Sequence, residues 1–238
     1  MRAIANIVFS SALSFCFSFA ATAQTAATPA PPSGTTPPQV GFKFDRVGLP
    51  VPHFSLRVSE NGTGTYQADR AEIPATQTSM RGQAAQHIDR PVNLSSGTVA
   101  KIFKVAQSLN HFNVECASKA KNIADTGTKT LTYAGSDGSG SCVYNYSENK
   151  TVQLLTDIFL GIASTLDEGR KLEFLHRYDR LGLDAEMNSF ADEVKEGRAL
   201  ELGTISSTLT SIADDTAVIQ RVRLRAAKML ELAADGSH

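Results

Sequence analysis

The chain of 238 residues is predicted to be an α+β protein: two β-hairpins forming a small antiparallel sheet with a packed helix, followed by a C-terminal, bundle-like helical half. Two observations predict this class. Before residue 149, several short segments alternate apolar and polar residues, which is typical of half-buried strands. After residue 150, apolar residues recur every three or four positions, which is typical of amphipathic helices. The two folded regions are therefore expected at 40–149 and 150–235.

The chain begins with a predicted secretory signal peptide, residues 1–23. Arg2 supplies the positive charge, an uncharged apolar run follows, and the Ala-Thr-Ala ending at Ala23 is typical of a cleavage site. The run of about 16 residues is shorter than the roughly 20 that span a bilayer, which favours cleavage over a transmembrane anchor. Lipidation of Cys16 is a second alternative, but Phe15 is larger than the residue that normally precedes a lipidated cysteine.

Residues 24–39 contain proline, threonine, alanine and serine without any charge, which predicts an extended linker and places the start of the fold near Val40. Signal peptide and linker together predict an exported protein of bacterial type, periplasmic or extracellular. No stable membrane span is expected after cleavage. The 23 basic and 24 acidic residues nearly cancel. A dedicated nucleic-acid-binding protein needs a basic excess, so no nucleic-acid partner is expected.

The first β-hairpin is predicted at residues 53–68. Every second residue from Phe54 to Val58 is apolar, and the Asn-Gly pair ending at Gly62 is a strong hairpin-turn signal. A helix is predicted over 97–109, where a pair of serines precedes an apolar stripe and offers an N-cap. The remaining strands are expected from Gly41 to Asp45, at 86–92, and at 128–133 and 142–146, which form the second hairpin.

Cys116 and Cys142 are the two cysteines that remain once the signal peptide is removed, and we predict that they form a disulfide. This bond would tie the loop after the first helix to the edge of the second hairpin. Closing a loop of about 27 residues would add roughly 3–3.5 kcal/mol of stability. Neither cysteine has a CxxC partner or a histidine at ligand spacing, so a metal site is not predicted.

The helical half is predicted to hold four or five helices. A first apolar stripe ends at Leu166, and Thr165-x-x-Glu168 matches a capping box that would begin a new helix. Gly182 is placed to end that helix and Asp184 to cap the next one, which would finish near Gly197. Further helices are expected over 200–212 and 218–233, the last of them capped by Asp214 and Asp215.

The densest polar cluster comprises His176, Arg177 and Arg180, which we take as the candidate binding residues. Arg177 and Arg180 could form a fork that binds a carboxylate or a phosphate. The interpretation that the pattern favours is an ordinary helix end, at which basic side chains face the negative end of the helix dipole and pair with Asp179 and Asp184.

No catalytic, cofactor or metal motif is recognisable, and none of these is predicted. The favoured hypothesis is a non-enzymatic binding or structural module of the cell envelope, with another envelope protein as the candidate partner. The alternative is a secreted hydrolase whose site is assembled from scattered residues. Its candidates are His87, His111 or His176 together with Glu173 or Asp179.

Overall fold

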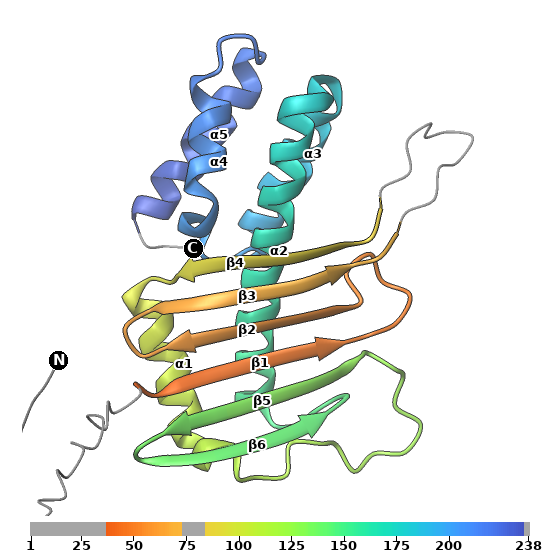
Figure 1. Cartoon of the computed structure of the whole chain (residues 1–238), viewed down its shortest axis with the longest axis vertical. Helices are drawn as coiled ribbons and strands as arrows, with labels where there is room; N and C mark the ends of the chain where they lie inside the picture. The colour runs from red at the N-terminus through yellow and green to blue at the C-terminus, as the bar shows by residue number, and fades with distance from the viewer. Residues whose placement is uncertain (1–36, 73–83, 236–238) are drawn as a thin grey trace, which may run out of the picture. The chain divides into compact units, whose positions relative to one another are not determined.

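The computed structural model describes residues 37–72 and 84–235. Six strands form one antiparallel sheet in the order β4-β3-β2-β1-β5-β6 (Figure 1). The predicted α+β class is confirmed, and both predicted hairpins are present as β2–β3 and β5–β6. The signal peptide and most of the linker lie outside the described residues, so they stay predictions. The strands are β1 (Gln39–Asp45), β2 (His53–Ser59), β3 (Thr63–Arg70), β4 (Gln86–Asn93), β5 (Thr128–Gly135) and β6 (Gly138–Tyr144).

Strand β1 lies between the two hairpins and joins them into one sheet. Phe42 of β1 is opposite Leu56 on one side and opposite Leu131 on the other. The period of two directs Val40, Phe42 and Phe44 to the same face, where all three are buried. The apolar alternation read from the sequence therefore marks the face that packs against the helices.

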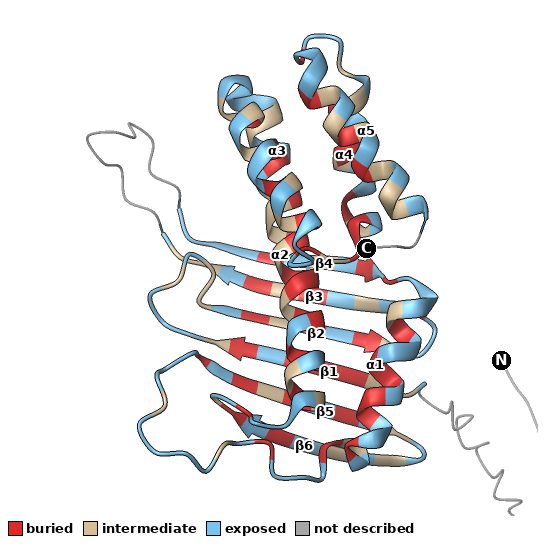
Figure 2. Ribbon diagram, turned by 180° about the vertical axis from the view of Figure 1, so that it is seen from behind, coloured by how far each residue is buried: buried red, intermediate tan, exposed pale blue. Residues whose placement is uncertain are grey.

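Helices α1 (Ser96–Ser108) and α2 (Lys150–Tyr178) lie on the same face of the sheet (Figure 2). Ser95 caps α1 by accepting a hydrogen bond from the backbone N–H of Thr98. Ile102 of α1 and Phe159 of α2 are fully buried, and the ring of Phe159 stacks on Phe42 with a centroid distance of 5.1 Å. Among the described residues, no helix covers the opposite face of the sheet (Figure 1).

The buried apolar residues form two clusters, and α2 contributes to both. Its first half, through Leu166, packs in the cluster under the sheet, while Leu172 belongs to the cluster among the later helices. Within residues 37–72 and 84–235, no helix has both the length and the apolar character needed to cross a membrane. The remaining helices are the 3-10 turns η1 (Asn110–Phe112) and η2 (Leu202–Ile205), and α3 (Arg180–Lys195), α4 (Ser206–Asp214) and α5 (Gln220–Ala234).

Two predicted helix boundaries are wrong. Helix α2 continues through Thr165, whose hydroxyl donates to the carbonyl of Gly161 inside the helix. A threonine can bond the carbonyl four residues back, so a capping-box pattern does not by itself begin a helix. The chain instead breaks at Asp179, whose carboxylate accepts from the N–H of Gly182 and caps α3. Gly182 therefore lies in the first turn of α3, and Asp184 lies within that helix.

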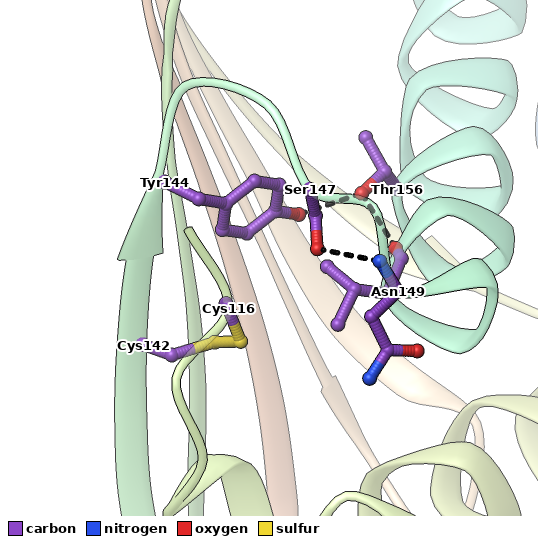
Figure 3. The surroundings of a disulfide bond; sticks show 7 residues. Cys116, Cys142, Tyr144, Ser147, Asn149 and Thr156 are labelled. Atoms are coloured by element: carbon purple, nitrogen blue, oxygen red, sulfur yellow. Dashed lines mark hydrogen bonds between the residues drawn. A yellow bond between two sulfur atoms is a disulfide. The ribbon is translucent and has the colours of Figure 1, made fainter. Parts of the chain in front are cut away.

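The predicted disulfide between Cys116 and Cys142 is confirmed (Figure 3). Cys142 lies on β6, an edge strand of the sheet, so the bond ties the loop after α1 to that edge. The N–H of Ser118 also donates to the carbonyl of Tyr146, at 2.8 Å, just beyond the strand. The bond thus braces a loop that lacks regular secondary structure between Asn113 and Gly127.

Candidate functional site

The candidate functional site is a polar cavity of about 590 Å³, which we call the basic pocket. It lies where the end of α2 and the start of α3 meet α4 and the edge strand β4. The three candidate residues named from the sequence, His176, Arg177 and Arg180, all line it. Its lining consists of Arg90, Glu173, His176, Arg177, Arg180, Ser207, Thr208, Ser211 and Asp215.

Helix geometry explains why the α2 residues share this cavity. Glu173 and Arg177 are four residues apart and His176 is three from Glu173, so all three lie on neighbouring positions of one helix face. Helix α2 ends at Tyr178, and Arg180 is the first residue of α3. Because the break is at Asp179, the side chain of Arg180 stays at the same end of α2 as Glu173, His176 and Arg177.

Asp215, immediately after α4, connects two of the basic side chains. Its Oδ2 lies 2.9 Å from Nε2 of His176 and 3.3 Å from a terminal nitrogen of Arg180. The hydrogen bond from His176, the backbone N–H of Ala217 and the charge of Arg180 hold the pKa of Asp215 below its usual range. Asp215 is therefore ionised at neutral pH and orients both partners.

A second ion pair closes the pocket toward the sheet. Arg90 of β4 donates to Glu173 of α2 with a distance of 3.2 Å between nitrogen and oxygen. The two residues are 83 positions apart in the chain. This contact joins the edge of the sheet to the end of α2. The arginines of the pocket therefore come from the sheet, in Arg90, and from the helices, in Arg177 and Arg180.

Arg177 differs from the other two arginines because no carboxylate of the described residues lies within ion-pair distance of it. Its guanidinium lies over the ring of Tyr178, 5.9 Å from the centroid. The pocket thus holds three arginines against two carboxylates. Hydroxyl groups of Ser207, Thr208 and Ser211 face the same cavity. Arginine forks beside hydroxyl donors are suited to a carboxylate or a phosphate.

The other histidines proposed for a hydrolase site are not brought together. His87 pairs with Asp69 at 2.7 Å on the open face of the sheet, and His111 lies 3.3 Å from Asp137 near the β5–β6 turn. Asp179 caps α3 and takes no part in the His176 pair. Across the described ranges, no group of three or more His, Cys, Asp or Glu side chains could hold a metal ion.

Sequence reasoning missed Arg90 and Asp215 as site residues. Asp215 was expected to cap the last helix, but α5 begins at Gln220 without a side-chain cap, and Asp215 accepts from Ala217 instead. Asp215 and His176 are 39 positions apart. No local pattern carries a contact over such a separation, so only the packing of α4 against α2 reveals it.

A second cavity, of about 490 Å³, lies beside β6 and the start of α2. Tyr144 and Thr156 share a hydrogen bond of 2.6 Å in its wall (Figure 3). Lys129 is only 6% exposed, and its ammonium donates to carbonyls that include those of Gly127 and Asn145. Burial, followed by the charge of Arg46, lowers its pKa. With these donors already satisfied, Lys129 holds the loop together and is not a candidate for catalysis.

Glu168 is a carboxyl group whose pKa is raised strongly. It lies between α2 and α3, with only 13% of its side chain exposed. Burial raises its pKa to about 8, and a hydrogen bond with Glu186 acts in the same direction, while the charge of Lys171 opposes it. It does not line the basic pocket. The raised pKa of Glu168 makes the stability of the protein depend on pH.

The free energy of unfolding should fall as pH rises from about 5 to 9. The folded state binds the Glu168 proton more tightly than the unfolded state, so its stabilising effect is complete below the ordinary pKa of 4.5 and is lost as pH rises through about 8. Glu168→Gln should flatten this dependence and stabilise the protein at pH 9 by ~2 kcal/mol. Urea unfolding at about pH 5 and at about pH 9 measures the change in the free energy of unfolding. Glu231→Gln, which replaces an exposed glutamate, is the control. Equal slopes in all three proteins would contradict this assignment.

Comparison with known proteins leaves the fold and the pocket as the basis for inferring function. No protein-family model matches the chain, and a search of curated proteins finds no significant match.

Proposed function

We propose that this chain is an exported binding module of the cell envelope that captures an anionic group, a carboxylate or a phosphate, in the basic pocket. The observation that carries the proposal is Arg177, a cation that lines the cavity without a carboxylate partner among the described residues. An arginine that lines a polar cavity forms charge-assisted hydrogen bonds when an anion binds there. The export part of the proposal rests on the predicted signal peptide and agrees with the disulfide.

The other basic groups support the same ligand chemistry. Arg180 and His176 are held in place by Asp215, and Arg90 is held by Glu173, so the guanidinium groups are oriented before a ligand arrives. Binding to such a preorganised site loses little side-chain entropy. Ser207 and Thr208 of α4 also line the cavity and supply hydroxyl groups as neutral donors for the remaining oxygens of the ligand.

Titration calorimetry with inorganic phosphate and with acetate tests the proposal. We expect at least one of these anions to bind, and Arg177→Gln to weaken the binding about tenfold or more, as a lost charge-assisted hydrogen bond does. Arg57→Gln, an exposed arginine on the open face of the sheet, is the matched control and should bind as the wild type does. Binding that is absent, or that is equal in the Arg177 and Arg57 variants, would overturn the proposal.

The hydrolase alternative is favoured by one observation, the pair between His176 and Asp215 in a cavity that also contains hydroxyl groups. A carboxylate-oriented histidine next to a serine is the arrangement that activates a nucleophile. The hydroxyl of Ser211, however, donates to the carbonyl of Ser207 rather than to the imidazole. Turnover of a p-nitrophenyl ester that disappears in His176→Gln and in Ser207→Ala would favour the hydrolase over the binding module.

A further inference from the structure

We infer that the ligand of the basic pocket is a protein segment that carries an apolar side chain within two positions of an acidic one. This inference rests on the proposed function and names its partner. It depends on an exposed apolar surface beside the pocket, which we call the aromatic tip. The aromatic tip consists of Phe174, Tyr178 and Leu181, at the end of α2 and the start of α3.

The aromatic tip adjoins the pocket at Arg177. Phe174 and Tyr178 each follow, by one position, the pocket residues Glu173 and Arg177, which places them about 100° around the helix from those residues. The rings of Phe174 and Tyr178 are 5.1 Å apart, and the guanidinium of Arg177 lies over Tyr178. Arg177 is thus shared between the cavity and the apolar surface.

The exposure of these side chains is unusual for their size. Leu181 is 92% exposed and Tyr178 is 61% exposed, although both lie in ordered helices. Large apolar groups gathered at one place on a surface mark interaction sites more often than isolated ones do. Tyrosine and arginine are also the residues that most often dominate the energy of protein interfaces. A small anion held in the pocket would leave the aromatic tip uncovered.

An extended protein segment matches both parts of this surface. Alternate side chains of such a segment point to the same side and are about 6.6 Å apart along the backbone. A carboxylate at Arg177 and an apolar side chain two positions away therefore match the spacing between Arg177 and the ring of Tyr178, which is 5.9 Å. Clusters of arginine are a recurring way of recognising acidic motifs. The charges are complementary, because the pocket offers the cations that an acidic segment needs.

A membrane surface fits these charges less well. Docking onto anionic lipid requires a cluster of basic residues with little opposing charge. Here Asp215 lies against Arg180, Asp179 caps α3, and Asp184 pairs with Arg221. The pocket itself is left with an excess of one cation, which suits a single carboxylate of a peptide but not the cluster of anionic headgroups on a membrane. The structure therefore favours a protein partner.

Selection from a library of random displayed peptides tests the inference on the mature chain. We expect the retained peptides to combine glutamate or aspartate with leucine, phenylalanine or tyrosine within two positions. The double variant Phe174→Ser/Leu181→Ser should bind the best retained peptide about tenfold more weakly, yet bind inorganic phosphate as the wild type does, because it keeps the ring of Tyr178 under Arg177. Leu224→Ser replaces a leucine on α5 that is 62% exposed; it is the control and should leave peptide binding unchanged.

The outcomes separate this inference from the proposed function. Phosphate binding that does not depend on Arg177 would overturn the proposed function itself. If phosphate binds as proposed, a failure of the library to yield acidic–apolar peptides, or peptide binding that is insensitive to the tip variant, overturns only the partner. Sedimentation with phosphatidylcholine–phosphatidylglycerol vesicles is the third measurement. Binding to vesicles that is lost in the tip variant, without selected peptides, would replace the protein partner with a membrane surface.

Discussion

Replacing Phe159 with alanine is expected to lower the free energy of unfolding by about 4 kcal/mol, the largest effect we predict for a single residue. Phe159 is fully buried in the middle of α2, and its ring stacks on Phe42 of the central strand with an interplanar angle of 1°. Removing the ring loses its burial and leaves a cavity between the helix and the sheet. The surrounding strands are fixed by their ladders, so the cavity cannot close fully.

Urea unfolding followed by circular dichroism measures this effect, and Phe174→Ala is the matched control. Both changes remove a phenyl ring from α2, but Phe174 is 41% exposed, so its replacement should cost less than ~1 kcal/mol. If the two variants unfold at the same urea concentration, α2 does not pack on the sheet through Phe159.

Removing the disulfide is expected to have the second-largest effect, a loss of about 3.5 kcal/mol for Cys116→Ser/Cys142→Ser. The two cysteines are 26 positions apart, and their bond restricts the unfolded chain by closing that loop. The part of this loop that precedes β5 has no regular secondary structure, and the N–H of Ser118 within it donates to the carbonyl of Tyr146. For a protein of this size the loss corresponds to a decrease in Tm of roughly 10 °C.

Calorimetric scans of the wild type with and without dithiothreitol, and of the double serine variant, provide the measurement. The reduced wild type and the variant should melt at similar temperatures, both below the oxidised protein. Phosphate binding in the basic pocket should survive in the variant, because the bond lies beside β6 and not beside the helices that form the pocket. If the reduced protein melts at the same temperature as the oxidised one, the disulfide contributes nothing to stability.

Local patterns were sufficient for most of the secondary structure. Alternation from Phe54 to Val58 predicted a strand and its buried face, because the period of a strand is set by the backbone alone. Ser95 predicted the start of α1, because a cap forms within one turn of the chain. The disulfide was also predictable, since only two cysteines follow the predicted signal peptide and they have a single possible pairing.

The helix boundaries near Thr165 and Gly182 show where local patterns stop being sufficient. The same Thr-x-x-Glu sequence is compatible with a helix start and with a helix interior. Thr165 is buried and bonds to the carbonyl of Gly161, so it lies in the interior of α2. A single glycine can likewise end one helix or lie in the first turn of the next. Here Asp179 caps α3 by accepting from the N–H of Gly182, so Gly182 lies in the first turn of α3.

The sequence alone was enough to propose His176, Arg177 and Arg180 as a candidate cluster, because they lie within five positions of one another on or next to one helix. Only the tertiary structure could show that they share a cavity with Arg90 and Asp215. Those contacts join residues 83 and 39 positions apart, and they depend on how α2 and α4 pack beside the edge of the sheet. Local propensity determines which elements form, whereas contacts between elements distant in the chain determine which side chains meet.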